Sequence, residues 1–368
     1  MLSAGNSIGK DFVFTCFGES HGKCVGAIID GCPAGLSLSK KDIQLELDRR
    51  IPSKREIVSA RVEKDSVEIL SGVFEGRTTG APICALTRNR DARSSDYEQA
   101  KDLLRPGHAD YAARIRYRNF NDYRGGGRFS GRMTVAFIMA GAVAKKLLRR
   151  FNVKIAAYTV AIGGIELRRE PTIDEIERRF DNPVRCPDPD TAKIMEEAIM
   201  NAKAEGDSLG GIVQCIASNV PPGLGQPIFD SLDADLAKML FNIPAVKGVE
   251  VGAGFKSAEM KGSEFNDYYS TREGKITTLT NNAGGILGGI SSGMPISVRV
   301  AIKPTSSIRK KQKTVDLSRM EETIIEVKGR HDPCIVPKAV SAVESSTALI
   351  LADHMLRAGA IPRVLAEE

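Results

Sequence analysis

The stretch Arg124–Arg132, RGGGRFSGR, lies directly before a helix predicted over Val135–Arg150. Its glycines permit a close approach to the backbone, and the first amides of a helix bind anions because their N–H groups have no partner within the helix. Arg128 and Arg132 add donors suited to phosphate or carboxylate. The stretch is not a Walker loop, since no Gly-Lys-Ser/Thr follows at the required spacing. It indicates an anion site, with a glycine-rich turn carrying surface arginines as the alternative.

Strand-like and helix-like segments lie on both sides of that helix. The strand-like runs are Phe12–Phe17, Cys24–Asp30, Val67–Leu70, Pro82–Thr87, Val153–Ile162, Ile212–Ala217 and Ile296–Ile302. The other helix-like runs are Lys40–Arg50, Thr191–Glu205, Ser231–Phe241 and Lys338–Arg357. Mixed elements throughout predict an α/β or α+β protein and leave the strand order open. The halves echo each other loosely, which suggests an internal duplication without a clear sequence repeat.

Composition restricts the class of protein. The 368 residues are 42% hydrophobic and 27% charged, as in soluble globular proteins, with a net charge of +6. This mild basicity suits nucleic acid or a small polyanionic ligand. No apolar run reaches the roughly 18 residues of a membrane span, and Met1–Asn6 carries no signal-peptide pattern, so we expect a cytoplasmic enzyme. The cysteines form no Cys-x-x-Cys pair, and Cys16, Cys24 and Cys32 are expected to be buried, reduced thiols.

Three of the four histidines lie in short polar runs beside glycine. His21 stands in GESHG, His108 in RPGHAD and His331 in GRHDP. Because imidazole changes charge near neutral pH, histidines among arginines and glycines indicate proton transfer on an anionic substrate. His21, His108 and Asp332 also form a candidate metal set, although without the His-x-x-x-His spacing of a helical zinc site. His354, within an apolar helix, is interpreted as a packing or surface residue.

Two further segments have a composition suited to phosphate. Asn281–Gly293, NNAGGILGGISSG, is so flexible that something must pack against its backbone, often a flat ring or a phosphate. Lys303–Lys313, KPTSSIRKKQK, offers hydroxyl and ammonium groups and is expected to be mobile. A solvated loop and a phosphate-binding lid are both open for this second segment.

Taken together, these runs resemble the chorismate synthase family. The matching segments follow the family's order over almost the whole chain: GESHGKCVGAIIDGCP (Gly18–Pro33), RPGHADY (Arg105–Tyr111), RGGGRFSGR, CPDPD (Cys186–Asp190), AVKGVE (Ala245–Glu250), NNAGGILGGISSG, KPTSS (Lys303–Ser307) and GRHDPC (Gly329–Cys334). The resemblance implies an α+β fold of the β-α-β sandwich type, in which two antiparallel sheets enclose helices in two similar halves. It also implies one domain over residues 1–368, with residues 361–368 disordered, assembled as a homotetramer.

The activity implied by the resemblance is a lyase step of the shikimate pathway, in aromatic amino-acid biosynthesis. 5-Enolpyruvylshikimate 3-phosphate loses phosphate and a ring hydrogen in a 1,4-anti elimination that gives chorismate. Reduced FMN is required, although the reaction has no net redox change. NADPH is expected only as an indirect reductant of the flavin, because no Gly-x-Gly-x-x-Gly follows a strand. No metal, nucleic acid or membrane is expected as a partner.

The resemblance also assigns roles to residues at matching positions. The expected catalytic residues are His21 as the acid near the departing phosphate, His108 at flavin N1 and Asp332 as the base at flavin N5. The expected FMN-binding residues are Arg128, Phe129, Ser130, Pro244, Ala245, Gly288, Lys303, Pro304, Thr305, Ser306, Ser307 and Arg330. The expected substrate-binding residues are Ser20, Arg50, Arg105 and Arg132.

Three positions depart from the family's usual pattern. Phe129 replaces a small residue, commonly serine, so its ring either crowds the flavin or turns outward. Pro244 stands where asparagine is common, and it removes an amide donor. The run Asp48–Pro52, DRRIP, lacks a third arginine that is often present.

Two other classes of protein compete with the lyase. An RNA-binding protein would use the RGGGR and KKQK segments, but the chain has no tryptophan and only 5% aromatic residues for base stacking. A metal-dependent phosphohydrolase would use the three histidines together with Asp332.

Overall fold

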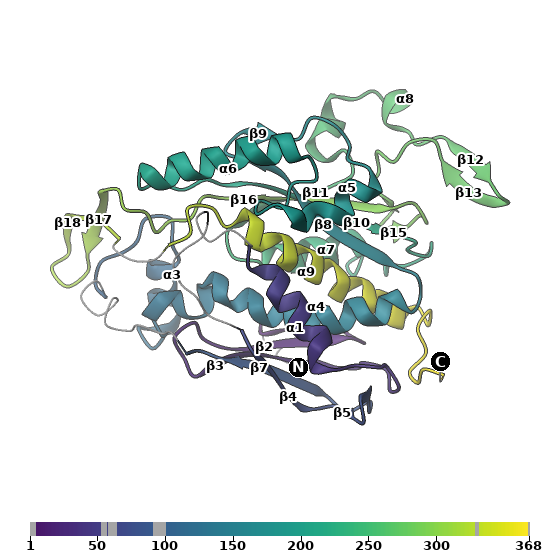
Figure 1. Ribbon diagram of the computed structural model, residues 1–368, viewed down its shortest axis with the longest axis horizontal. Helices are drawn as coiled ribbons and strands as arrows, with labels where there is room; N and C mark the ends of the chain where they lie inside the picture. Colours follow the sequence, from purple (N-terminus) through teal and green to yellow (C-terminus); the bar gives the residue numbers. More distant parts are fainter. Residues whose placement is uncertain (1–4, 53–56, 58–64, 91–100, 328–330, 367–368) are drawn as a thin grey trace.

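The computed structural model describes residues 5–52, 57, 65–90, 101–327 and 331–366. Two antiparallel sheets enclose a layer of helices (Figure 1). The antiparallel pairing decides for α+β over α/β, which the strand and helix runs alone left open. The expected β-α-β sandwich is confirmed.

Each half of the chain supplies one five-stranded sheet with antiparallel neighbours. In spatial order, the first sheet contains β1 (Ser7–Ile8), β2 (Val13–Gly18), β3 (Cys24–Asp30), β7 (Ile83–Arg88) and β4 (Val67–Ser71). The second contains β11 (Val246–Val251), β16 (Ile296–Ile302), β10 (Gly211–Ser218), β8 (Lys154–Ile162) and β9 (Ile165–Glu166). A long helix follows each sheet along the chain, so the two halves share one plan.

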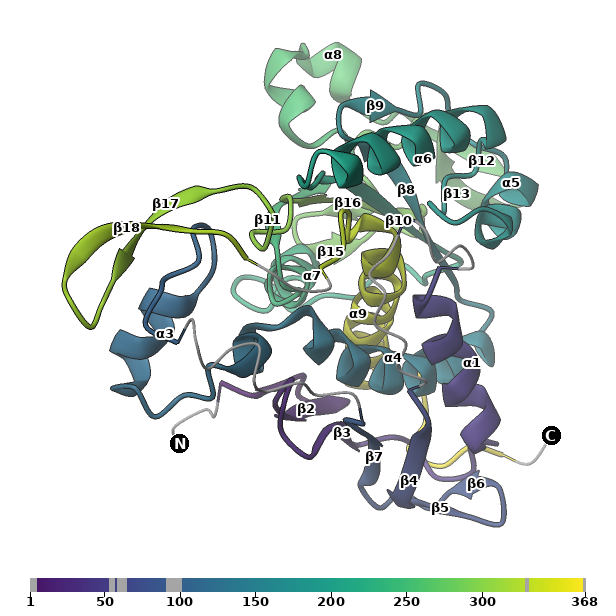
Figure 2. The same cartoon turned by 60° about the vertical axis from the view of Figure 1, so that its left-hand side comes forward.

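The long helices lie between the sheets. α4 (Thr134–Arg149) packs on the first sheet, α9 (Val336–Arg357) packs on the second, and the two helices pack on each other. α1 (Lys40–Arg50) and α7 (Leu232–Phe241) flank this pair on opposite sides (Figure 2). α6 (Pro189–Ala204) covers the outer face of the second sheet (Figure 1).

The two central helices are apolar on nearly all sides because both are enclosed. Almost every side chain of α4 and α9 is buried, unlike the one-sided pattern of a surface helix. They approach each other closely at Gly141, where an added Cβ would lie 2.2 Å from Cβ of Ser345. A glycine inside a helix costs about 1 kcal/mol relative to alanine, and this close approach explains its presence.

A buried ion cluster joins the central helices. Lys145 of α4 contacts Glu46 of α1 and donates to Glu344 of α9 at 2.6 Å. Glu344 also accepts from Arg179 at 2.8 Å and from the backbone N–H of Ala157 at 2.9 Å. Burial alone would raise the pKa of Glu344, but Lys145 and Arg179 hold that pKa below its usual value. The core thus contains a charged carboxylate whose partners come from several elements.

Shorter elements lie around this sandwich. They are α3 (Asp110–Tyr117), α5 (Ile173–Glu177), α8 (Gly262–Phe265), β5 (Val73–Phe74), β6 (Arg77–Thr78), β12 (Tyr269–Arg272), β13 (Lys275–Thr278), β14 (Ile286–Leu287), β15 (Ile290–Ser291), β17 (Gln312–Asp316) and β18 (Glu321–Ile325). The β12–β13 and β17–β18 hairpins project from opposite ends of the molecule (Figure 1).

Two segments expected to be flexible are held by the chain itself. The glycines of Asn281–Gly293 pack on other backbone: an added Cβ on Gly284 would lie 2.3 Å from the nitrogen of Gly252. Within Lys303–Lys313, the N–H of Arg309 donates to the carbonyl of Gly206 at 2.9 Å, and the last two residues begin β17. The second segment is therefore more regular than the predicted mobile loop.

The C-terminal residues 361–366 pack onto the first half of the chain. Ile361 and Leu365 are buried in the core, and the N–H of Leu365 donates to the carbonyl of Ala34 at 2.9 Å. The expected disorder of residues 361–368 is therefore wrong for residues 361–366, because their apolar side chains are covered. Residues 367–368 lie outside the described part.

Cys16, Cys24 and Cys32 were expected to be buried thiols. Cys16 and Cys32 are buried free thiols, whereas Cys24 is half-buried. Burial raises the pKa of the Cys32 thiol to about 12, so it stays protonated.

Across the described ranges, no helix combines the length and apolar character needed to cross a membrane.

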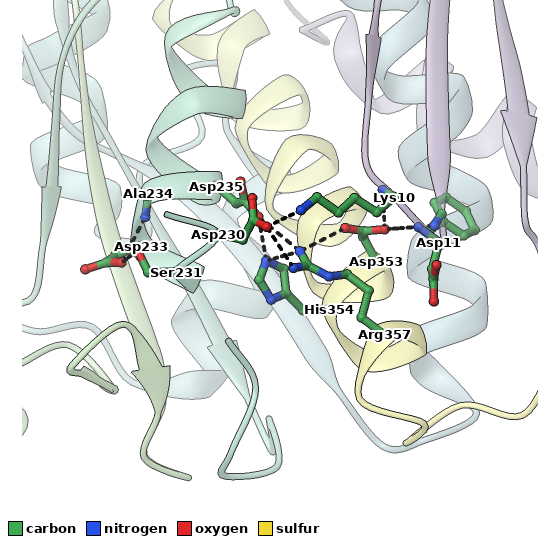
Figure 3. Close-up of polar contacts among 11 residues, drawn as sticks. Lys10, Asp11, Asp230, Ser231, Asp233, Ala234, Asp235, Asp353, His354 and Arg357 are labelled. Carbon is green, nitrogen blue, oxygen red and sulfur yellow. Dashed lines mark hydrogen bonds and ion pairs between the residues drawn. The ribbon is translucent and has the colours of Figure 1, made fainter. Parts of the chain in front are cut away.

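A polar cluster ties the start of the first sheet to the end of α9 (Figure 3). One carboxylate oxygen of Asp353 accepts the N–H groups of residues 10–12, at 2.8, 2.7 and 2.9 Å. The neighbouring His354 is buried, and its Nε2 lies 2.9 Å from Asp235. Arg357 lies 3.3 Å from the same carboxylate. His354 is thus a packing residue, one of the two roles predicted for it.

His354 should make the fold sensitive to acid. Burial, together with Arg357, lowers the pKa of His354 despite its hydrogen bond with Asp235. The unfolded chain takes up this proton below about pH 6.5 and the folded chain only at lower pH, so stability falls as pH drops, by up to about 1.4 kcal/mol per unit of pKa depression. Unfolding at pH 7.5 and 5.5 should show a smaller acid loss for His354→Asn than for the wild type. Equal losses would remove His354 as the cause.

Candidate active site

A cavity of about 1380 Å³ is lined by segments from both halves of the chain. The first half contributes the loop after β2, the end of α1, the loop before α3 and the turns before α4. The second half contributes the α7–β11 connection, the loop after β16 and the start of α9. The cavity therefore depends on the docking of the two halves.

The lining of the cavity is basic. Its cationic residues are Arg50, Arg105, Arg128, Arg132, Lys203, Lys247, Lys303 and Lys338. Its carboxylate residues are Asp65 and Asp332. His21, His108 and His331 line it as well. This excess of positive charge favours a ligand that carries several negative charges.

Gly125–Gly127 bring the backbone directly against two of these imidazoles. Their φ angles are 59°, 84° and 51°, in the left-handed region that favours glycine. An added Cβ on Gly125 would lie 2.1 Å from Nδ1 and Cε1 of His21, and one on Gly126 would lie 3.0 Å from Nε2 of His108. The glycines were predicted to let an anion approach the backbone closely. Two candidate catalytic side chains, His21 and His108, make such an approach in this structure.

The sequence suggested that the triple glycine leads directly into a helix, but two turns precede that helix. An irregular turn, Arg124–Phe129, and a 3₁₀ turn, Gly131–Met133, come before α4. Ser130 connects them, and its hydroxyl accepts the N–H of Arg132 at 3.3 Å. Ser130, Gly131, Arg132 and Thr134 all line the cavity, so the start of the helical region still faces it.

Asp110 orients both His108 and Arg105. Its carboxylate accepts from Arg105 at 2.7 and 2.8 Å and lies 2.6 Å from Nδ1 of His108. Burial alone would raise the pKa of Asp110, but hydrogen bonds from Arg105 and His108 hold that pKa well below its usual value. An ionised carboxylate requires a proton on Nδ1, which leaves Nε2 of His108 for the ligand side.

Asp110→Asn should therefore lower kcat at least about tenfold, since an Asp-to-Asn change behind a catalytic histidine can cost up to about 10⁴-fold. The amide keeps the side-chain shape but no longer fixes the His108 tautomer. Steady-state kinetics test this, with Asp102→Asn as the matched control, because Asp102 pairs with Arg114 at 3.3 Å and does not line the cavity. Equal kcat values for the two variants would show that Asp110 has no orienting role.

Asp65 holds two arginines at the cavity wall. It is buried, and its Oδ1 accepts from Arg132 at 2.5 Å while its Oδ2 lies 3.6 Å from Arg50. Arg132 also donates to Asn89 at 3.0 Å, and Arg50 donates to Thr134 at 3.4 Å. Two guanidinium groups share one carboxylate here, so a net positive charge remains for an anionic ligand.

Asp332 is paired with a lysine from the first turn of α9. Nζ of Lys338 donates to both of its carboxylate oxygens at 2.7 Å. The hydroxyl of Thr305 donates to the backbone carbonyl of Asp332 at 3.0 Å and joins the loop after β16 to this region. Burial, reinforced by Arg105, lowers the pKa of the adjacent His331 below its usual value. This shift makes His331 harder to protonate than an ordinary histidine and so weakens it as a candidate proton donor.

Arg128 and Phe129 leave the triple glycine in different directions. Arg128 donates to Oδ1 of Asn6 at 2.8 Å and to the carbonyl of Gly18 at 3.3 Å. The Phe129 ring is 40% exposed and packs at a tilt on Tyr117 of α3, with the ring centroids 6.5 Å apart. The Phe129 side chain is therefore directed toward α3.

Comparison with known proteins identifies the family. The family model described as chorismate synthase matches residues 12–356. The chain belongs to the chorismate synthase family. The chorismate synthase of Methanothermobacter thermautotrophicus is 54% identical over 359 residues, which are 97% of this chain and 96% of that protein. The one from Korarchaeum cryptofilum is 54% identical over 354 residues, covering 96% of this chain and 98% of that protein.

A solved structure extends the match to three dimensions. A crystal structure of chorismate synthase, 34% identical in sequence, superposes with a TM-score of 0.76 and covers 95% of this chain and 93% of that one. As a member of the chorismate synthase family, the chain is an enzyme. It is a carbon–oxygen lyase of the shikimate pathway that forms chorismate by eliminating phosphate from 5-enolpyruvylshikimate 3-phosphate.

Most positions expected from the chorismate synthase motifs line the cavity. They are His21, Arg50, Arg105, His108, Arg128, Phe129, Ser130, Arg132, Pro244, Ala245, Lys303, Thr305, Ser306, Ser307 and Asp332. Ser20, Pro304 and Gly288 do not line it: Ser20 is buried, and Gly288 lies in the turn between β14 and β15. Arg330 lies outside the described residues.

Ala245 has a strained backbone beside the cavity. Its φ is 73°, which is uncommon for a residue with a Cβ, and its carbonyl accepts the N–H of Lys303 at 2.9 Å. Strain of this kind persists where neighbouring structure fixes it, and it is concentrated at functional sites. Pro244 and Ala245 are therefore held firmly at the cavity, although Pro244 offers no N–H.

Three ion-pair partners in this chorismate synthase site were missed from the sequence. Asp110 had a local signal, because it stands two residues after His108 in RPGHADY. Asp65 and Lys338 had no local signal of this kind. Asp65 pairs with Arg132 of a distant segment, and Lys338 pairs with Asp332 across the start of α9. In the part of the chain that the structure describes, no three His, Cys, Asp or Glu side chains are placed to hold a metal ion.

Proposed function

We propose that this cavity binds 5-enolpyruvylshikimate 3-phosphate together with reduced FMN and carries out the 1,4-anti elimination there, with no net redox change. The observation that carries the proposal is the placement of His21 and His108 against Gly125 and Gly126, inside a cavity lined by arginine and lysine. The reaction needs groups that transfer protons beside a polyanion, and this site combines them.

Size and charge both support two bound molecules. Ligand pockets usually measure about 300–1,000 Å³, and the cavity of about 1380 Å³ exceeds that range. The substrate carries two carboxylates and a phosphate, and FMN adds a second phosphate. The basic lining therefore matches the combined charge of substrate and flavin.

The loop after β16 suits the flavin phosphate. Burial, with Lys247 nearby, lowers the pKa of Lys303, so an anion placed here would relieve an unfavourable site for an ammonium group. An added Cβ on Gly107 would lie 3.5 Å from Cβ of Ser306 and 3.9 Å from Nζ of Lys303, so this loop adjoins that of His108. The hydroxyls of Thr305, Ser306 and Ser307 add further donors. We assign this loop to FMN, with Arg128–Ser130, Pro244–Ala245, Gly288 and Arg330 as its further contacts.

The substrate is assigned to three arginines of the lining that carboxylates hold in place. Arg50 and Arg132, which share Asp65, and Arg105, which Asp110 orients, would bind its carboxylates and phosphate. Ser20 is retained as a substrate-side residue, although it is buried behind the lining.

Reduced FMN, when bound, supplies electron density that helps to expel the phosphate and recovers it afterwards. With substrate and flavin bound, His21 would donate a proton to the departing phosphate, and His108 would donate to the N1 region of the flavin. Asp332 would serve as the base at flavin N5. Its carboxylate is held at the cavity by two hydrogen bonds from Nζ of Lys338, both at 2.7 Å.

The assembly, compartment and reductant are part of the same proposal. We assign a homotetramer, which the exposed apolar side chains of Phe229, Phe255 and Ile276 support, since such side chains are often covered in oligomers. Light scattering tests this. We place the enzyme in the cytoplasm and assign NADPH only an indirect role, as the reductant of a separate flavin reductase.

An anaerobic assay with three arms tests the proposed function. Protein and substrate are mixed with chemically reduced FMN, with oxidised FMN, or with oxidised FMN plus NADPH, and chorismate is followed by its absorbance. Chorismate is expected in the first arm only. Equal formation with oxidised FMN would contradict the role of the reduced flavin. Formation with NADPH would show that this chain reduces its own flavin.

A further inference from the structure

Arg185 is a buried guanidinium group whose partners are backbone carbonyls. It is 3% exposed, and its Nη2 donates to the carbonyls of Arg49 and Ile51, both at 3.1 Å. Its Nη1 donates to the carbonyl of Phe180, also at 3.1 Å. Within the described ranges, it has no carboxylate partner. A buried cation without a carboxylate is unfavourable in a core, so this arrangement calls for a reason beyond stability.

The guanidinium of Arg185 shares an aromatic platform. It lies 4.8 Å from the centroid of the Phe180 ring, and the guanidinium groups of Arg179 and Arg49 lie 4.4 and 5.2 Å from the same centroid. Arg179 is fixed in turn by Glu344, at 2.8 Å. Cation–π contacts and the buried ion pair together give this part of the chain one defined arrangement.

The loop that carries Arg185 is anchored to the second sheet. The carbonyl of Arg185 accepts the N–H of Thr159 in β8 at 3.0 Å, and the Thr159 hydroxyl donates to the carbonyl of Val184 at 2.6 Å. The side chain of Asn182 bonds both backbone groups of Cys186, at 3.2 and 2.6 Å. Arg185 itself has a φ of 63°, a conformation that L-residues adopt at some cost. The backbone that carries the Arg185 guanidinium group is therefore held rigidly.

The two carbonyls that Arg185 holds stand on either side of Arg50. They belong to the C-terminal end of α1, where helix carbonyls have no partner within the helix and where a cation is favoured by the helix dipole. Arg50 and Ile51 line the cavity, and the guanidinium of Arg50 reaches Asp65 and Thr134. The direction of the Arg50 side chain depends on where this short piece of backbone is fixed.

We propose that Arg185 is a positioning residue of the active site, which fixes the end of α1 so that Arg50 presents its guanidinium to the anionic substrate. This inference rests on the proposed role of Arg50. It also gives a function to the residue that precedes the CPDPD motif: Arg185 holds the end of α1 to β8. Within the motif, Asp188 caps α6 by accepting the N–H of Thr191 at 2.8 Å.

Kinetics of Arg185→Gln test the proposal. The KM for 5-enolpyruvylshikimate 3-phosphate should rise about tenfold or more, because a displacement of about 1 Å in a binding group has effects of this size. The value of kcat should change less than about threefold, since the lost interaction is one of substrate binding, and reduced-FMN affinity should stay unchanged. Arg178→Gln is the matched control, because among the described residues the Arg178 side chain donates to the carbonyl of Asp174 in its own turn, at 3.4 Å.

A double mutant separates this inference from the proposed function. Once Arg50→Gln has raised KM, adding Arg185→Gln should raise it no further, because both changes remove the same interaction. If Arg50→Gln leaves KM unchanged, the proposed role of Arg50 fails. If Arg50→Gln raises KM and Arg185→Gln lowers only the melting temperature, Arg185 is purely structural and the positioning role is overturned.

Arg185→Lys keeps the test decisive if Arg185→Gln does not fold. A lysine retains the buried charge, but its single ammonium group cannot replace the planar fork that reaches three carbonyls. A KM raised about threefold or more in folded Arg185→Lys is expected, because each well-placed contact contributes a factor of this order. A wild-type KM for this variant would overturn the proposal.

Discussion

His21→Ala and His108→Ala should each lower kcat by about 10²- to 10⁴-fold, the range over which positioned acids and bases contribute to catalysis. Both imidazoles lie against the triple glycine and line the cavity, yet neither belongs to the apolar core. The melting temperature should therefore stay close to that of the wild type. Steady-state turnover under anaerobic conditions and thermal unfolding measure the two quantities separately.

His331→Ala provides the comparison for this experiment. His331 lines the same cavity, but burial and Arg105 lower its pKa, so it is harder to protonate than an ordinary histidine. Its replacement should lower kcat far less than either of the other two changes. A near-normal kcat for His21→Ala or His108→Ala would remove that residue from the catalytic set.

Gly125→Ala should nearly abolish activity through a single methyl group. The added Cβ would lie 2.1 Å from the His21 ring, so the imidazole or the turn must move. A displacement of about 1 Å costs on the order of 10²-fold in rate. The alanine must also adopt a φ of 59°, which adds about 1–2 kcal/mol of strain.

Gly274→Ala is the control that separates backbone strain from the steric clash with His21. Gly274 has a φ of 74° in the β12–β13 turn, and an added Cβ there would meet nothing within 4 Å. It should show a comparable loss of stability with normal turnover. If Gly125→Ala keeps normal turnover as well, the close contact with His21 does not position the imidazole.

The helices and strands of the core could be predicted because apolar residues recur in them at the spacing of a helix or a strand. α1 has the predicted bounds Lys40–Arg50, and α4, α6, α7 and α9 begin and end within two residues of expectation. α3 was missed because only Ala113 of its residues is buried. β11 was missed because a glycine and two charged residues interrupt VKGVEV. The strand order depends on pairings between distant segments, which no local pattern encodes.

The residues of the site could be predicted from the sequence better than the contacts between them. The motifs around His21, His108 and Asp332 are local, so their chemistry could be seen in the sequence. Asp65, in contrast, pairs with Arg132, which lies 67 positions away along the chain. The glycines were expected to permit the close approach of an anion, and their contacts with His21 and His108 could not be foreseen. Such contacts arise only once the two sheets have docked.

The number of chorismate molecules formed per reduced FMN tests the central claim most directly. Protein and excess substrate are mixed anaerobically with a small, measured amount of chemically reduced FMN, and chorismate is counted after all reductant has been consumed. Because the proposed reaction returns the flavin to its reduced state, many chorismate molecules are expected per flavin. At most one chorismate per reduced FMN, or none, would contradict the account.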